Sequence, residues 1–301
     1  MLQVSARMTT ILISGATGYA GRFIAEAFLA DRHDVIALSR TPPPSGFFSR
    51  PVRWMAGSLD PDADHDTVFA GADIFVHCAF AHLPGRYRGG EGDDPAAFVR
   101  ANVDGTLALM AAARHVGVSR AIFLSSRAVY GPKPPGTVLV EDTPCAPDTL
   151  YGETKLAVET ALAAMADVRF LPVSIRATGI YGPAGPGRAH KWARLFEAFS
   201  GGEEIAPRIG TEVHGDDLAN AVRLLATIPA ERLVALGAAP VFNVSDLLLD
   251  RRDLLSAYAE RAGIDRPLPP RADAAAFNAM DCARLTALGW RPRGRLDLTG
   301  L

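Results

Sequence analysis

Two side chains that can carry out proton chemistry stand four residues apart in the segment TLYGETKLAVE, residues 149–159: Tyr151 and Lys155. On a helix this spacing puts both on one face, where they can meet. A tyrosine needs help to exchange protons at neutral pH, because its reference pKa is about 10. A lysine cation one turn away can help by favouring the phenolate. A core tyrosine beside a surface lysine has the same spacing, so the choice depends on the rest of the chain.

The hydrophobic pattern of the first half predicts the elements that would position this pair. Short apolar runs predict strands, and helical periodicity predicts helices between them. The strands are expected at residues 10–15, 34–39, 52–56, 73–79, 120–126 and 169–176, and the helices at 20–31, 94–115 and 151–166. Alternation of this kind is typical of a parallel sheet covered by helices on both faces. We therefore expect an α/β fold with a doubly wound parallel sheet.

The pattern changes after residue 176. The segment TGIYGPAGPGR, residues 178–188, is rich in Gly and Pro and is interpreted as a loop, and helices are expected near 190–200, 216–227 and 251–262. Few strand signals follow. We interpret residues 8–176 as one domain and 177–301 mainly as a cap, with some elements returning to the first domain. Such a cap would cover the carboxyl edge of the sheet, where open α/β sheets bind ligands.

A glycine-rich loop follows the first predicted strand and leads into a helix in ISGATGYAGRFIAE. Glycine permits close approach of a ligand, and a helix N-terminus favours a pyrophosphate. A plain tight turn explains the glycines alone, but the strand–loop–helix context predicts a dinucleotide site. The residues expected to contact the cofactor there are Gly15, Thr17, Gly18, Tyr19, Ala20 and Gly21.

The end of the second predicted strand indicates which dinucleotide binds. An acidic residue there binds the 2′-hydroxyl of NAD, whereas an arginine accommodates the 2′-phosphate of NADP. The chain has Ser39 and Arg40 at this place. A solvated surface charge is the alternative interpretation of Arg40. We predict a preference for NADP(H), with NAD(H) also possible as the cofactor.

Motifs in a fixed order along the chain resemble those of the extended short-chain dehydrogenase/reductase family, which includes the NAD-dependent epimerases and dehydratases. They are GATGYAG (15–21), GSLD (57–60), FVHCA (75–79), NVDGT (102–106), LSSRAVYG (124–131), YGETK (151–155), RATGIYGP (176–183) and VHGDDLA (213–219). The resemblance covers about residues 10 to 295. It implies a Rossmann sheet with a small C-terminal substrate-binding lobe, and a catalytic set of Ser126, Tyr151 and Lys155.

The same resemblance implies further contacts with the cofactor. Ser58 and Leu59 should lie along the adenine, Ala79 beside the cofactor, and Tyr151 and Lys155 at its reactive end. Ordinary packing explains the presence of Ser58, Leu59 and Ala79 at these positions equally well. Arg176 and Asp216 are assigned to anchoring the cap. The helices near 94–115 and 151–166 could pair across a homodimer.

Several positions depart from the subclasses of this family. Arg127 and Ala128 replace the Asp-Glu pair of the dehydratases, which argues against a 4,6-dehydratase. Gly179 and Gly210 replace the Asn and Arg by which nucleotide-sugar epimerases hold a diphosphate. The residues expected to bind the substrate come from the catalytic set, from the departing positions 127 and 179, and from a second glycine-rich loop at residues 81–95. They are Arg86, Arg88, Ser126, Arg127, Tyr151 and Gly179.

Composition and charge exclude other classes of function. The 301 residues carry a net charge of −2, which gives no electrostatic case for nucleic acid or an anionic membrane. No run approaches the roughly 20 apolar residues that span a bilayer. The three cysteines are far apart, as expected for reduced thiols, and the seven histidines form no metal motif. We expect a cytoplasmic protein without a metal.

Three hypotheses remain from the sequence. The first is an NAD(P)-dependent oxidoreductase acting on a carbonyl or secondary alcohol of a small, sugar-like substrate. The second is a UDP-sugar 4-epimerase, which oxidises and then reduces the same carbon. The third is a non-catalytic NADP(H)-binding redox sensor. The complete set of Ser126, Tyr151 and Lys155 favours an enzyme, because a sensor need not keep it.

Overall fold

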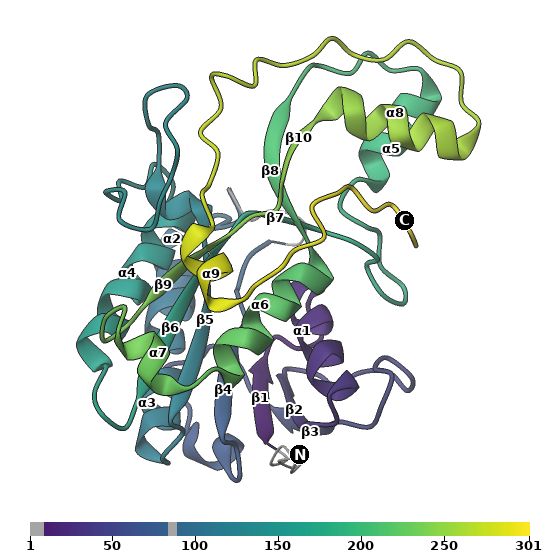
Figure 1. Ribbon diagram of the computed structural model, residues 1–301. Helices are drawn as coiled ribbons and strands as arrows, with labels where there is room; N and C mark the ends of the chain where they lie inside the picture. Colours follow the sequence, from purple (N-terminus) through teal and green to yellow (C-terminus); the bar gives the residue numbers. More distant parts are fainter. Residues whose placement is uncertain (1–8, 84–88) are drawn as a thin grey trace, which may run out of the picture.

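A seven-stranded parallel sheet forms the centre of the computed structural model, which describes residues 9–83 and 89–301 (Figure 1). Its strand order is β3-β2-β1-β4-β5-β6-β9. The strands are β1 (Thr10–Ser14), β2 (Asp34–Ser39), β3 (Arg53–Ala56), β4 (Ile74–His77), β5 (Arg120–Ser126), β6 (Leu171–Ala177) and β9 (Val241–Val244). The predicted α/β fold with a doubly wound sheet is confirmed.

Helices cover both faces of this sheet. α1 (Tyr19–Ala30) and α6 (Gly215–Thr227) pack on the face that Ile11 and Ile13 present, and α3 (Gly105–His115) and α4 (Leu150–Met165) pack on the face of Leu12. Successive strand residues point to opposite faces, so these uninterrupted apolar strands bury both. The predicted helix 94–115 is split into α2 (Pro95–Val99), a π-helical segment at Arg100–Asp104 (η2) and α3.

The C-terminal part contributes to two structures. α5 (Ala193–Gly201) and α8 (Arg251–Ala262) form a lobe with a three-stranded sheet of order β10-β8-β7 (Figure 1). Its strands are β7 (Gly179–Tyr181), β8 (Ile209–His214) and β10 (Leu247–Asp250). The expectation of a loop over 178–188 is thus wrong at β7, because pairing with β8 makes Gly179–Tyr181 a strand in spite of the glycines. The shortage of strands expected after residue 176 is also wrong.

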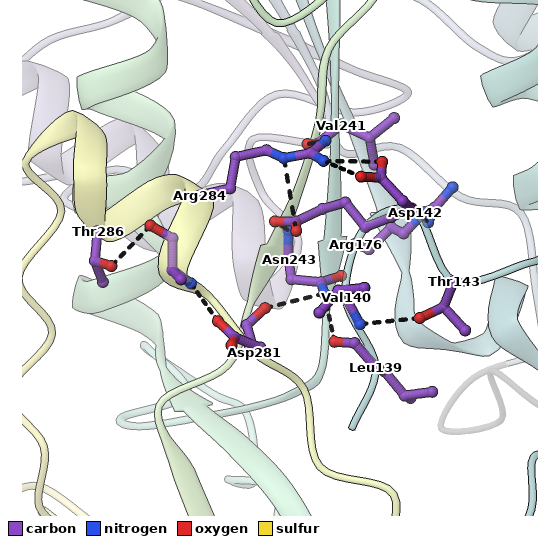
Figure 2. Close-up of polar contacts among 12 residues, drawn as sticks. Leu139, Val140, Asp142, Thr143, Arg176, Val241, Asn243, Asp281, Arg284 and Thr286 are labelled. Atoms are coloured by element: carbon purple, nitrogen blue, oxygen red, sulfur yellow. Dashed lines mark hydrogen bonds and ion pairs between the residues drawn. The ribbon is translucent and has the colours of Figure 1, made fainter. Parts of the chain in front are cut away.

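The remaining C-terminal elements return to the central sheet. β9 is its last strand, and α7 (Ala230–Val234) and α9 (Ala283–Leu288) lie beside it in Figure 1. The amide of Asn243 on β9 donates to the carbonyl oxygens of Leu139 and Asp281, and Arg284 on α9 binds both carboxylate oxygens of Asp142. Figure 2 shows these contacts joining α9 and the 139–143 loop to β9. This polar cluster fixes the end of the chain on the first domain.

The strand order reverses between β1 and β4. The chain leaves β1 toward β2 on one side and reaches β4 on the other, and ligands of open α/β sheets bind at such a switch point. Across residues 9–83 and 89–301, no helix is long and apolar enough to cross a membrane.

Candidate functional site

The glycine-rich loop closes tightly against the end of β4. Gly15 has a φ of 69°, and a Cβ there would lie 2.8 Å from the backbone nitrogen of Ala79. A Cβ on Gly21 would lie only 2.1 Å from the carbonyl oxygen of Gly15. Gly18 is the N-cap of α1 and donates its N–H to the same oxygen. The first turn of α1 therefore lies directly against the loop, and the free N–H groups of that turn suit a pyrophosphate.

The remaining side chains predicted around the loop lie at its rim. Tyr19 donates its hydroxyl to the carbonyl oxygen of Gly182, which ties the loop to the segment after β7. Thr17 and Ala20 are half-buried. Gly182 directly follows β7 of the lobe, so this hydrogen bond links the glycine-rich loop to the lobe.

The end of β2 shows the surroundings of the predicted 2′-phosphate contact. The Ser39 hydroxyl donates to the Thr41 carbonyl and accepts from the indole N–H of Trp54 on β3. Arg40 is exposed at the end of the strand. The Ser39 hydroxyl is therefore engaged by its own neighbours, and Arg40 is the side chain there that could reach a 2′-phosphate.

Ser58 and Leu59 follow β3 at the same edge. The Ser58 hydroxyl accepts from the backbone N–H of Asp60. The Leu59 backbone packs on α3, because a Cβ on Gly105 would lie 2.2 Å from its carbonyl oxygen. The side chain of Leu59 is half-buried against the core under the sheet. Leu59, which the family resemblance assigns to the adenine, thus also packs against the core.

Ser126, Tyr151 and Lys155 come together from β5 and α4. Ser126 is the last residue of β5, and Lys155 Nζ donates to the carbonyl oxygen of Leu124, two residues earlier, at 2.8 Å. The first turn of α4 packs against the segment after Ser126, since a Cβ on Gly152 would lie 2.6 Å from the Ala128 carbonyl oxygen. Tyr151 and Lys155 share one face, with Lys155 Nζ 6.0 Å from the Tyr151 ring centroid. The structure therefore brings the predicted set to one place on the carboxyl edge.

Burial controls the charge of the groups around Lys155. Desolvation lowers the pKa of Lys155 to about 7, against the opposing attraction of the Glu159 carboxylate. Burial also lowers the pKa of His77 to about 3, and the Lys155 cation adds to this shift. His77 accordingly stays neutral between the Ser14 and Thr106 hydroxyls, at 2.8 and 3.0 Å. A lysine with this pKa changes charge near neutral pH, which is useful beside an acid or base.

The other predicted substrate contacts have partners within the chain. The Arg127 guanidinium donates to the Asn278 carbonyl at 2.7 Å and lies over the Phe277 ring. Lys191 and Glu212 form an ion pair directly above Gly179. Arg86 and Arg88 lie outside the described residues. Arg127 thus binds a segment that closes over the edge of the sheet, about 150 residues later in the sequence.

No group of three or more His, Cys, Asp or Glu side chains that could hold a metal ion occurs in the part of the chain that the structure describes. The cysteines are not joined: Cys78, Cys145 and Cys282 are free thiols.

Comparison with known proteins identifies the family. The model of the NAD dependent epimerase/dehydratase family matches residues 11–237. The chain belongs to this family. It is 28% identical over 188 residues to a UDP-glucose 4-epimerase of Corynebacterium glutamicum, covering 59% of the chain and 54% of the relative, and 30% identical over 199 residues to that of Erwinia amylovora, covering 62% and 56%. The chain thus spans about half the length of these curated relatives.

A solved structure gives a fuller match. MoeE5 in complex with UDP-glucose and NAD is 27% identical, with a TM-score of 0.75, and the match covers 96% of this chain and 94% of that one. The resemblance to the epimerase/dehydratase family seen in the sequence is thus confirmed, and so is the Rossmann fold with a C-terminal lobe. Members of this family are enzymes, as predicted, whereas the roles of the individual site residues stay a prediction.

Behind the candidate site of this family member lies a buried ion pair that the sequence did not indicate. Arg176 on β6 donates to both carboxylate oxygens of Glu159, and Ser125 donates to the same carboxylate. Glu159 is one turn after Lys155 on α4. Arg176 therefore anchors α4, and its assignment to the cap is wrong. The i, i+4 spacing of Glu159 from Lys155 was the signal available, although such spacing is common on helices.

The glycine loop gives a direct test of the dinucleotide site. Gly21→Ala should weaken dinucleotide binding by about 10-fold or more, because the new Cβ overlaps the backbone of Gly15 and the loop must shift. Isothermal titration calorimetry measures the dissociation constant. The control is Gly201→Ala at the end of α5, where a Cβ meets nothing within 4 Å. Unchanged affinity in the Gly21 variant would show that the dinucleotide binds elsewhere.

Proposed function

We propose that this protein is an NAD-dependent epimerase that inverts a hydroxyl-bearing carbon of a nucleotide sugar. The observation that supports this proposal is that Lys155, on the helix of Tyr151, donates to the Leu124 carbonyl two residues before Ser126 at the end of β5, while the glycine loop lies against Ala79 after β4. The similarity to UDP-glucose 4-epimerases, and to a structure that holds UDP-glucose and NAD together, supports epimerisation over a simple reduction.

The proposed roles follow from the chemistry of the three side chains. The Tyr151 hydroxyl takes the proton from the substrate hydroxyl during oxidation and gives it back during reduction. Lys155, as a cation beside Tyr151, favours the phenolate form. The Ser126 hydroxyl, now accepting from the Ala128 N–H, orients the substrate oxygen by a hydrogen bond. One residue set serves both half-reactions, because the second is the reverse of the first on the opposite face of the sugar.

The residues of the loop fit the pyrophosphate of a dinucleotide. The close backbone contacts of Gly15 with Ala79 and of Gly21 with Gly15 leave no room for side chains at these two positions of the loop. A bound nicotinamide supplies the acceptor and donor of the hydride. We propose NAD as this cofactor, in line with MoeE5, in place of the NADP preference expected from Ser39 and Arg40, which the comparisons do not support. Arg40 is then a solvated surface charge.

A second candidate is an oxidoreductase acting on a small sugar-like substrate without a diphosphate. The ion pair of Lys191 and Glu212 favours it, because the pair occupies the space above Gly179. Burial raises the pKa of Glu212 and lowers that of Lys191, so desolvation disfavours both charges, and the attraction within the pair opposes this effect. A carboxylate there would repel a diphosphate, unless Lys191 turns to bind it.

One experiment separates the two candidates. The freshly purified protein is denatured, the released dinucleotide is identified by mass spectrometry, and the native protein is incubated with UDP-glucose. An epimerase must keep its cofactor through both half-reactions, so we expect NAD near one per chain and formation of UDP-galactose. An empty protein that oxidises or reduces small sugars with added cofactor would instead support the second candidate. A protein that binds a dinucleotide and does neither would contradict both candidates.

A further inference from the structure

Phe80 is a large aromatic side chain in direct contact with two of the candidate catalytic residues. Its ring meets the Tyr151 ring edge to face, with 5.1 Å between centroids, and lies 4.6 Å from the Lys155 ammonium nitrogen. The buried Phe123 ring lies 4.7 Å from the same nitrogen. The ammonium is therefore held between two rings while it donates to the Leu124 carbonyl.

The backbone around Phe80 is fixed on both sides. Ala79 before it lies against Gly15 of the glycine loop. Ala81 after it is bound at both of its polar groups by the Asn102 side chain, which accepts from the N–H and donates to the carbonyl, each at 2.8 Å. Asn102 belongs to the π-helical segment η2, and such segments are frequent at functional sites. Phe80 thus occupies a defined place on the sheet edge.

A second ring supports Phe80 from α2. The Phe98 ring meets it edge to face at 5.5 Å between centroids. Phe98 is buried, whereas Phe80 is only half-buried. The Phe80 ring therefore stands between buried packing and the open edge of the sheet, where it covers the ammonium.

We propose that Phe80 is a positioning residue of the active site. Its ring holds the Tyr151 side chain in place and keeps water from the Lys155 ammonium. The proposal rests on the proposed function, because it deepens the role of the same Tyr-Lys pair. An aromatic face attracts a cation, whereas its bulk excludes the water that a cation prefers. Of these opposed effects, exclusion of water is the larger here, since desolvation is the leading cause of the lowered pKa of Lys155.

The groups that surround Lys155 are few. His77 at the end of β4 and Cys78 just after it face Lys155, as do Tyr151 and Glu159 from its own helix and the Leu124 carbonyl from β5. Burial raises the pKa of Cys78 to about 12, so neither this thiol nor the neutral His77 changes charge near pH 7. A change in the pKa of Lys155 after substitution of Phe80 would accordingly report on water access.

The test measures the pKa of Lys155 without any substrate. Acetylation of Lys155 by acetic anhydride is followed over pH by peptide mass spectrometry, and the midpoint gives the pKa irrespective of the maximal rate. In Phe80→Ala we expect this midpoint to rise by at least about one unit toward the ordinary lysine value of about 10.4. Phe80→Leu should keep the midpoint, because its side chain still excludes water. If the alanine variant does not fold, Phe80→Val takes its place, and the same rise in the midpoint is expected.

Activity gives a second readout that separates positioning from binding. We expect Phe80→Ala to lose about 10-fold in kcat, with the dissociation constant of NAD within about 3-fold of the original. A midpoint that does not move in the alanine or valine variant would overturn the inference. If the midpoint moves in a protein that converts no nucleotide sugar, Phe80 has the assigned position and the proposed function fails instead.

Discussion

Tyr151→Phe should lower kcat of the proposed epimerisation by at least about 10²-fold, the usual scale for loss of a general acid or base. The substitution removes one hydroxyl and keeps the ring, so the edge-to-face contact with Phe80 remains. The dissociation constant of NAD and the unfolding temperature should therefore change far less than kcat. Initial rates with UDP-glucose, titration calorimetry and thermal unfolding measure the three quantities.

The matched control is Tyr258→Phe in the lobe. Its hydroxyl lies 3.1 Å from the Ser200 hydroxyl, and its ring stacks on Phe196 at 3.9 Å between centroids. Loss of this hydroxyl should leave kcat within about 2-fold, because Tyr258 is on α8, outside the Ser126–Tyr151–Lys155 set. A Tyr151→Phe enzyme with the original kcat would remove Tyr151 from the mechanism, whatever the substrate is.

Arg176→Leu should destabilise the fold by roughly 3–5 kcal/mol, because it leaves the Glu159 carboxylate buried without its guanidinium partner, although the Ser125 hydroxyl still donates to it. The side chains of Arg176 and Glu159 are 7% and 5% exposed, so solvent cannot replace the lost partner. Urea denaturation measures the free energy of unfolding. The same loss should move α4, and with it Lys155, so activity should fall at temperatures where the variant remains folded.

Two further variants identify the cause of this destabilisation. Arg223→Ala breaks the ion pair with Asp31, whose two side chains are each 39% exposed, and should cost no more than about 1 kcal/mol. The double variant Glu159→Leu with Arg176→Leu removes both buried charges and should recover much of the stability lost in the single variant. If Arg176→Leu unfolds at the original urea concentration, the buried pair does not hold α4 in place.

Local sequence patterns predicted the central elements well. The strands at 34–39 and 120–126 and the helix at 251–262 agree with the structure at both ends. These segments are apolar runs or regular helices bounded by polar or turn-forming residues, so neighbours in the sequence determine them. All four strands after residue 176 were missed, β7, β8, β9 and β10. The shortest of them, β7 and β10, have three or four residues and form strands because each pairs with β8. The sequence pattern likewise predicted a continuous helix over 94–115, where the structure has the π-helical η2.

The order of the family motifs, the glycine loop and the helical spacing of Tyr151 and Lys155 can be recognised from the amino-acid sequence alone. Each depends on residues within a few positions of one another, where backbone geometry fixes the relation. Only the tertiary structure placed Phe80 on Tyr151 and Lys155, joined Lys191 to Glu212 above Gly179, and bound Arg127 to the segment at Asn278. These partners are between about 20 and 150 residues apart, and such contacts arise from how strands and helices pack rather than from spacing along the chain.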